Sequence, residues 1–198
     1  MKKSQQVYLV FKRIIGIFGS LVGILVCFIF FWWWVIPINA IVTKGHPFFL
    51  SKRVGQNDTS FKLIKFRSMK LNTNPEMTSS YADTEHLVTK FGKFLRATSI
   101  DETPQLLNIL AGQMAFIGPR PLIDVHEDHI TIELRRQNGA IQLKPGLSGY
   151  AQIHGRTAVS PEQKGHLDGA YFQRFNFWLD VKIFIYTFLR LFGVAKGR

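Results

Sequence analysis

The feature that most constrains the fold is a run of 30 residues, Ile14–Thr43, without a single charged side chain. About 20 apolar residues span the hydrocarbon core of a bilayer, so this run is long enough to enter one. A signal peptide has a shorter apolar stretch, of about 7–15 residues, that ends in small residues, and Ile38–Ala40 is a poor cleavage site. A buried core helix is disfavoured, because the run carries three consecutive tryptophans in a short chain. We therefore expect residues 1–44 to form a membrane anchor.

Basic residues flank the run on both sides. They are Lys2, Lys3, Lys12 and Arg13 before it, and Lys44, Lys52, Arg53 and Lys62 after it. A spanning helix collects Lys and Arg mainly at its cytoplasmic end, and no such imbalance is present. The proline of Ile36–Pro37 lacks a backbone donor and should kink or end the helix. These observations favour a re-entrant hairpin whose two ends share one face of the membrane.

A spanning helix remains the alternative. Residues Ile14–Phe31 alone measure about 27 Å at 1.5 Å per residue, and the tryptophans would then form an interfacial belt on the far side.

The charge of the chain indicates an anionic partner. Lys and Arg number 25 and Asp and Glu 13, which gives a net charge of +12. Nucleic acid, phospholipid and a phosphorylated substrate all fit this charge. No carboxylate precedes Asp58, so the basic excess surrounds the apolar run and favours a membrane surface over nucleic acid. One cysteine, Cys27, excludes a disulfide framework and a zinc ribbon and is expected to pack.

Residues 45–198 have the pattern of a globular domain that is mostly helical with a few short strands, an α+β fold. Residues 61–70 alternate apolar and basic side chains as in a strand, and the polar stretch 71–82 indicates a loop. Helical spacing covers 86–96, the stretch from Asp101 as N-cap to a stop at Gly112, and the polar segment 124–137. The aromatic tail 171–192 is amphipathic, and it fits a core-packing helix and an interfacial helix on the membrane equally well.

The adjacent carboxylates Asp101–Glu102 are the strongest candidates for chemistry. The helix dipole alone could explain two acids at a helix start. However, Arg96 lies five residues earlier, Lys65 and Arg67 occupy the basic strand, and Gly118-Pro119-Arg120-Pro121 places an arginine on a stiff loop. Paired carboxylates beside several cations suit a divalent cation held against a pyrophosphate, and a rigid arginine suits phosphate recognition.

Other polar residues are weaker candidates. The stretch His126–His129 lacks the i, i+4 histidine pair of a helical zinc motif and fits a solvated helix face better. Ser99 has no evident base partner. Gly146, Gly149 and Gly155 are expected in turns. The sequence has no Walker loop and no GxGxxG, so a nucleoside triphosphatase or a dinucleotide enzyme is not supported.

Several motifs in order resemble the bacterial sugar transferase family, the monotopic phosphoglycosyl transferases. They are KFRSM (65–69), FGKFLRATSIDETPQLLNIL (91–110), GQMAFIGPRPL (112–122) and KPGLSGYAQIHGR (144–156). The resemblance covers nearly the whole chain from Lys12 onward. No counterpart of the four-helix membrane region of larger members is evident, so we expect the small form, similar to enzymes that act on a diacetamido-bacillosamine donor.

The resemblance implies transfer of sugar 1-phosphate from a UDP-sugar to undecaprenyl phosphate with release of UMP, the first membrane step of polysaccharide or glycoprotein glycan assembly. It implies Asp101 as nucleophile, Glu102 in the metal site or the acceptor step, and a requirement for Mg²⁺, with the acidic pair as metal ligands. It adds Arg156 to the expected substrate-binding residues. Partners would be membrane phospholipid and the two substrates, with a homodimer left open and no nucleic acid. The catalytic domain would lie on the cytoplasmic face of the bacterial inner membrane.

The sequence departs from the family pattern at several positions. Gly16 replaces an Asp, Ile36 replaces the Ser of a Ser-Pro break, and Thr103 replaces a Leu. Gln113 and Ala115 stand for an acid and a Ser, and Tyr150 for a Trp. None of these changes removes the acidic pair or a basic residue expected to bind phosphate.

Overall fold

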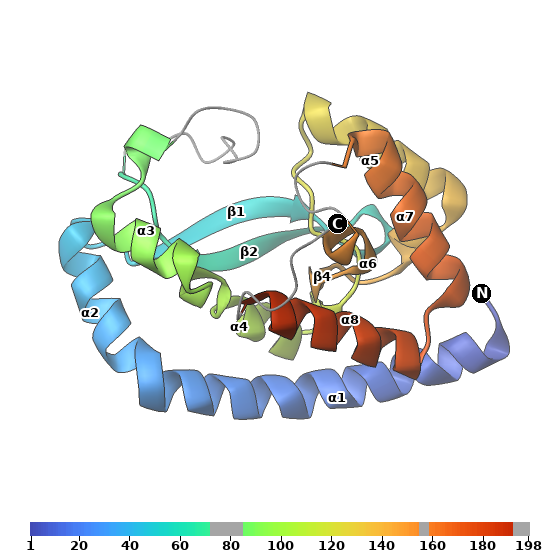
Figure 1. Cartoon of the computed structure of the whole chain (residues 1–198), viewed down its shortest axis with the longest axis horizontal. Coiled ribbons are helices and arrows are strands. Elements are labelled where there is room, and N and C mark those ends of the chain that lie inside the picture. Colours follow the sequence, from blue (N-terminus) through green and yellow to red (C-terminus); the bar gives the residue numbers. More distant parts are fainter. Residues whose placement is uncertain (72–84, 155–158, 192–198) are drawn as a thin grey trace.

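The structure, a computed structural model, describes residues 1–71, 85–154 and 159–191. This part of the chain is mostly helical with a few short strands, which confirms the predicted fold class. A long N-terminal helix runs along one side of the molecule, turns at its far end, and the rest of the chain folds against it (Figure 1).

The N-terminal helix is continuous but irregular. Helix α1 spans Lys3–Cys27, a π-helical segment η1 spans Phe28–Trp32, and α2 spans Trp33–Val42. Within the described residues, this stretch is the one helix long and apolar enough to cross a membrane. Its change of direction is plain in Figure 1.

The predicted break at Ile36–Pro37 is wrong in position. Pro37 lies inside α2, and the helix continues for another turn beyond it. The irregular segment ends at Trp32, and Trp33, the next residue, lies four positions before the proline. A proline ring clashes with the carbonyl four residues earlier, so the distortion belongs one turn upstream of Pro37.

Small residues let α1 approach the domain closely. Gly16, Ser20 and Cys27 are among its few buried residues. A Cβ atom on Gly23 would lie 3.0 Å from a methyl group of Leu106, in helix α4 (Gln105–Leu110). The outer face of α1 is apolar and exposed, with Phe11, Phe18 and Leu25 among its exposed side chains. The helix therefore has one face that packs against the domain and another that is apolar and exposed.

The strands form two separate pairs. Strands β1 (Phe48–Val54) and β2 (Ser60–Phe66) make an antiparallel hairpin around the short turn η2 (Gln56–Asp58). Strands β3 (Ala115–Ile117) and β4 (Gly146–Ser148) pair in parallel. The strand expected within 61–70 is confirmed up to Phe66, whereas β1, β3 and β4 were not predicted.

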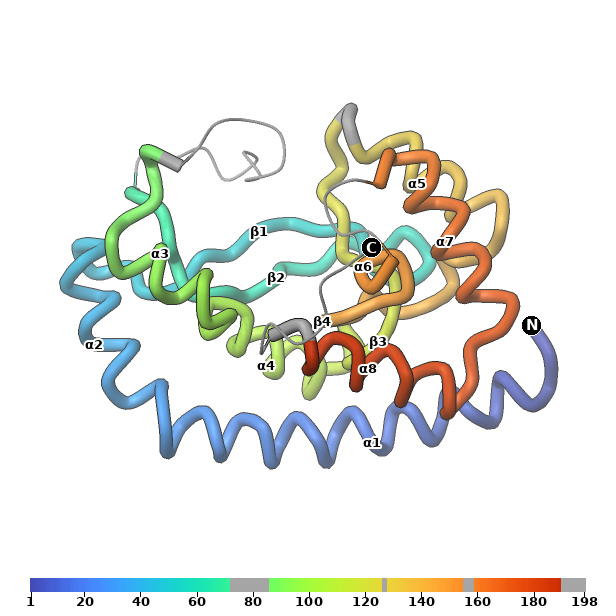
Figure 2. Tube along the Cα trace, viewed as in Figure 1, coloured from blue at the N-terminus to red at the C-terminus, as the bar shows by residue number. Residues whose placement is uncertain are grey.

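The remaining helices surround these strands. They are α3 (Lys90–Ala97), α5 (His126–Asn138), α6 (Tyr150–Ile153), α7 (Pro161–Arg174) and α8 (Phe177–Leu191), with 3₁₀ turns η3 (Glu85–Leu87), η4 (Ile100–Glu102) and η5 (Ala140–Gln142). The trace in Figure 2 shows α7 leading into α8, which returns the chain to α1. The single helix expected over 171–192 is therefore wrong, since the chain leaves α7 after Arg174 and starts α8 at Phe177.

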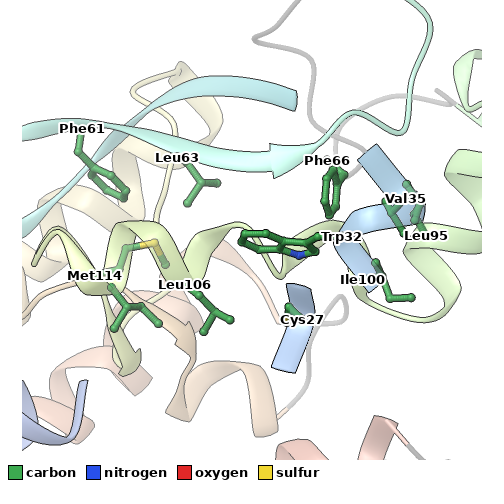
Figure 3. Close-up of a cluster of buried hydrophobic side chains, with 11 residues drawn as sticks. Cys27, Trp32, Val35, Phe61, Leu63, Phe66, Leu95, Ile100, Leu106 and Met114 are labelled. Atoms are coloured by element: carbon green, nitrogen blue, oxygen red, sulfur yellow. The ribbon is translucent and has the colours of Figure 1, made fainter. Parts of the chain in front are cut away.

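One hydrophobic cluster joins the N-terminal helix to the domain. Cys27, Trp32 and Val35 pack with side chains from β2, α3, η4 and α4 (Figure 3). The expectation that this apolar run is excluded from the core is wrong for one face of the helix. The side chains that the run turns inward complete the core beneath η4.

A buried polar cluster fixes the first half of α1. Lys12 Nζ lies 2.6 Å from Asp180 Oδ2 of α8 and donates to the Tyr171 hydroxyl at 2.7 Å. Tyr8 and Tyr171 both donate to the Asp180 carboxylate, at 2.7 and 2.5 Å. The neighbouring Arg13 donates to the carbonyls of Ile109 and Leu110 at the end of α4. Lys12 and Arg13, interpreted from the sequence as flanking charges, are thus bound within the domain.

We predict that Asp180→Asn lowers the free energy of unfolding by about 3 kcal/mol, because it leaves the Lys12 ammonium buried without its counterion. The double variant Lys12→Met/Asp180→Asn should recover most of this loss. Urea unfolding in detergent, followed by tryptophan fluorescence, measures both. Asp124→Asn, at an exposed carboxylate, is the control, and an equal effect of Asp124→Asn and Asp180→Asn would contradict the prediction.

Candidate active site

The acidic pair and the basic strand meet where η4 packs against β2. Lys65 lies near the end of β2, and its Nζ is 3.0 Å from Glu102 Oε1. Both side chains keep partial access to solvent, at 20% and 33% exposure. This contact brings together Lys65 of the strand and Glu102 of the turn, which lie 37 positions apart in the sequence.

Asp101 lies deeper than Glu102. It is 9% exposed, and burial together with the neighbouring Glu102 charge raises the pKa of Asp101 to about 6. The charges of Lys65 and Arg96 act in the opposite direction on this pKa. The pair thus combines a partly exposed Glu102 carboxylate with a buried Asp101 carboxyl group whose pKa is raised.

The expected role of Asp101 as a helix N-cap is wrong. Asp101 lies inside the 3₁₀ turn η4, and Pro104 precedes the first residue of α4. The turn itself starts from Ser99, whose φ of 56° is left-handed. Capping therefore does not explain the acidic pair, which is left available for another function. The predicted stop is confirmed, because α4 ends at Leu110 just before Gly112.

The predicted basic residues differ in their positions. Arg96 Nε donates to Ser68 Oγ at 2.9 Å, and its charge acts on Asp101. Arg67 instead donates to the His46 carbonyl at 3.2 Å, with its guanidinium 5.5 Å from the Phe49 ring centroid. Arg96 therefore belongs to the surroundings of the acidic pair, whereas Arg67 is engaged at the base of the hairpin.

Close backbone packing sets the position of the loop that carries Arg120. Gly118 donates its N–H to the Ser148 carbonyl at 2.8 Å, and the Gly146 N–H reaches the Pro119 carbonyl at 2.8 Å. A Cβ atom at Gly118 would lie 2.4 Å from the Lys144 carbonyl oxygen. Glycine is thus required at 118 by the close approach of two backbones.

A buried ion pair supports this loop from behind. Arg135 of α5 contacts Asp168 Oδ2 of α7 through Nε at 2.8 Å and Nη2 at 2.6 Å. Its Nη1 donates to the backbone carbonyl of Arg120 at 3.0 Å. The pair therefore fixes the backbone of the residue whose side chain is exposed toward the site.

These elements border a small cavity that is open to solvent. Its lining residues are Arg53, Leu63, Lys65, Glu102, Gln105, Arg120, Pro121, Gly146 and Leu147. Three cations and one carboxylate thus share one concave surface, as predicted for Lys65, Arg120 and Glu102. Asp101 is not among the lining residues and is buried next to Glu102 in the same turn.

Arg53 and Gln105 were missed as cavity residues. Arg53 was counted only among the charges that flank the apolar run. It lies on the hairpin face that also carries Phe61 and Leu63, since β1 pairs Arg53 with Phe61. Apolar and basic side chains alternate along residues 61–65. Pairing this segment with a strand before it in the sequence could have placed Arg53 on the same face.

The donor set of the acidic pair fits a magnesium ion that also contacts a substrate phosphate. Mg²⁺ is commonly held by one or two carboxylates plus phosphate oxygens. No group of three or more His, Cys, Asp or Glu side chains converges within the described ranges.

In the segment His126–His129, Asp128 is buried and accepts the Ile123 N–H at 3.1 Å, so the expected solvated face is wrong for this residue. Arg156 and Gly155 lie outside the described residues.

Comparison with known proteins identifies the family. Residues 7–194 match the bacterial sugar transferase family. The chain therefore belongs to this family, as its motifs predict.

Individual relatives carry different donor names. An uncharacterized sugar transferase, EpsL, from Bacillus subtilis is 39% identical over 77% of this chain and 73% of its own length. A UDP-glucose:undecaprenyl-phosphate glucose-1-phosphate transferase from Xanthomonas campestris is 34% identical over 76% of this chain. The galactosyl transferase CpsE from Streptococcus agalactiae is 34% identical over 94% of this chain. The matched regions are 32% of the Xanthomonas protein and 43% of the Streptococcus protein.

We predict that the Asp101 carboxyl titrates near pH 6 in protein free of divalent cations. Because burial raises its pKa, the group is protonated below this pH and ionised above it. The infrared band of the protonated carboxyl, taken as the difference between wild type and Asp101→Asn, should disappear as the pH rises through this value. A band lost near pH 4, the ordinary value for Asp, would contradict the prediction.

Proposed function

We propose that this protein transfers sugar 1-phosphate from a UDP-sugar to undecaprenyl phosphate and releases UMP. The observation that carries the proposal is the cavity lined by Lys65, Arg53, Arg120 and Glu102, next to the buried Asp101 of the same turn. Cations around a carboxylate pair suit a diphosphate substrate, whose charge they neutralise. The names of several relatives, including those from Xanthomonas and Klebsiella pneumoniae, state this class of reaction for those proteins.

In the proposed first step, an oxygen of ionised Asp101 attacks the phosphorus bonded to the sugar. The bond from that phosphorus to the oxygen shared with the second phosphate breaks, and UMP leaves with the electron pair. A carboxylate is a competent nucleophile for such a covalent step. In the second step, an oxygen of undecaprenyl phosphate attacks the same phosphorus and displaces the Asp101 carboxylate. The products are undecaprenyl diphosphate sugar and the free enzyme.

The surrounding residues would stabilise charge in both steps. Arg120, on its loop fixed through Arg135, and Lys65, held by Glu102, would bind phosphate oxygens. Asp101 and Glu102 are the residues that would hold Mg²⁺, which supplies charge neutralisation at a transferring phosphoryl group. We propose a UDP-sugar without naming the sugar, because two relatives that are both 34% identical have names that refer to glucose and to galactose.

We predict that the purified protein in detergent releases UMP from a UDP-sugar with undecaprenyl phosphate and Mg²⁺. A donor panel covers the sugar, and identification of the nucleotide separates this reaction from a glycosyltransferase, which releases UDP. No nucleotide release from any donor would instead favour a non-enzymatic basic module that binds anionic lipid.

Substitutions in the acidic pair and at Arg120 should have distinct effects. Asp101→Asn should abolish turnover and any acid-trapped phosphosugar adduct, because an amide is not a comparable nucleophile. Glu102→Gln should reduce turnover severely with the fold intact. Arg120→Ala should weaken donor binding by about 1.5–3 kcal/mol through loss of a charged hydrogen bond. Wild-type turnover by Asp101→Asn would refute the covalent mechanism.

We further propose that the N-terminal helix enters the inner membrane as a re-entrant hairpin, with the domain on the cytoplasmic face. Support comes from contacts at both ends of the helix with the same body. Near its start, Gln5 donates to the Phe172 and Gln173 carbonyls. Near its end, Trp34 packs on Phe91 and Phe94 of α3. Contacts of both ends of the helix with one domain support the placement of both ends on the same side of the bilayer.

We predict that Ser4→Cys, in a Cys27→Ser background, resists an impermeant thiol reagent in intact spheroplasts and reacts after lysis. Lys44→Cys in the same background should behave identically, because both positions are assigned to the cytoplasmic face. Both side chains are exposed in the structure, so lysis provides the accessible reference. Labelling of Ser4→Cys alone in intact spheroplasts would demonstrate a spanning helix.

A further inference from the structure

The three consecutive tryptophans of the N-terminal helix make different contacts. Trp33 is 63% exposed and Trp34 packs on α3, and the indole N–H of each donates to a carbonyl four residues earlier in its own helix. Trp32 is 7% exposed, and its N–H leaves the helix to donate to Thr103 Oγ1 at 2.9 Å. Trp32 alone among the three thus forms a hydrogen bond to the segment next to the acidic pair.

Thr103 closes the turn that carries Asp101 and Glu102. Its hydroxyl accepts the Trp32 N–H and donates to the Ile100 carbonyl at 2.8 Å. Its backbone N–H reaches the same carbonyl at 3.1 Å. The hydroxyl therefore adds a second bond across η4 and connects this turn to the N-terminal helix.

Trp32 also contacts the strand that supplies Lys65. Its ring meets Phe66 edge-on, with centroids 6.2 Å apart and planes at 90°. Phe66 in turn stacks on Phe48 at 5.3 Å. Figure 3 shows the Trp32 indole next to Phe66, with Cys27 on its other side. One indole thus contacts Phe66 and Thr103, the residues that follow Lys65 and Glu102 in the sequence.

The position of this indole depends on the shape of the helix. Trp32 is the last residue of η1, the segment at which the helix changes direction (Figure 1). A regular α-helix through Phe28–Trp32 would rotate the side chain to another face. The hydrogen bond to Thr103 therefore requires the bent form.

We propose that Trp32 and Thr103 are positioning residues that make the geometry of the acidic pair depend on the bend of the N-terminal helix. The inference rests on the proposed function, since it assigns this geometry to phosphoryl transfer. It names a link between the N-terminal helix and the reaction, in which Trp32 takes part through its hydrogen bond to Thr103 and its contact with Phe66.

The kinetic test compares Trp32→Phe, Thr103→Val and their double variant with wild type. Phenylalanine keeps the ring contact with Phe66 and removes only the N–H donor. Each single variant should lower kcat about tenfold, with KM for the UDP-sugar unchanged, because a small displacement of a catalytic group slows the chemical step. The double variant should be no slower than the slower single variant. Thr103→Ser keeps the hydroxyl and should retain wild-type kcat.

Trp33→Phe is the matched control, since the Trp33 indole bonds only within its own helix in the described contacts. A decrease in kcat equal to that of Trp32→Phe would overturn the proposal, as would equal decreases for Thr103→Ser and Thr103→Val. If Trp32→Phe does not fold, the comparison of the two Thr103 variants decides the question.

Hydrogen–deuterium exchange tests the link without relying on activity. Peptides covering residues 100–106 should exchange faster in Trp32→Phe and Thr103→Val than in wild type, and unchanged in Trp33→Phe. Equal exchange in all four proteins would overturn the link. Absence of UMP release by wild type would refute the proposed function, and the exchange result would still decide whether the helix controls the turn.

Discussion

The turn that carries Asp101 and Glu102 depends on the hydrophobic core beneath it, and the N-terminal helix supplies one wall of that core. Trp32 and Val35 are buried there beside Ile100 and Leu106. Large apolar side chains are the main source of stability in such a cluster. The helix that the sequence identifies as a membrane segment is therefore also a structural part of the domain. Its outer apolar face packs against no part of the domain that the structure describes.

Electrostatic interactions connect the helix to the domain at buried positions, where they are costly to disrupt. The Lys12–Asp180 pair holds α1 to α8, and Arg135–Asp168 holds the Arg120 loop. A buried charge without its partner is strongly unfavourable, so each pair specifies one arrangement of the helices that it joins. At the site itself the charges are more exposed, as in the pair between Lys65 and Glu102. Exposed charges there leave room for an anionic ligand to replace water.

Sequence reasoning identified much of the site because its residues are charged and lie in short motifs. Lys65, Arg120 and Glu102 do line one cavity, and Arg96 acts electrostatically on Asp101. The same reasoning grouped Arg67 with them, although its guanidinium turns to the His46 carbonyl. It missed Arg53, because only the pairing of β1 with β2 brings this residue to the cavity. Charge pattern therefore predicted several residues that line the cavity, but the full set depends on strand pairing.

The sequence by itself determined the apolar helix, the mostly helical fold class and the family, since each depends on local composition or contiguous motifs. Only the tertiary structure decided that the helix distorts before Pro37. It also decided that Lys12 forms an ion pair with Asp180 and that Arg13 donates to carbonyls of α4. It also decided that Trp32, unlike Trp33, reaches Thr103. The physical reason is that neighbouring residues on a helix point in different directions. Which of them meets a partner is set by packing between segments far apart in the chain.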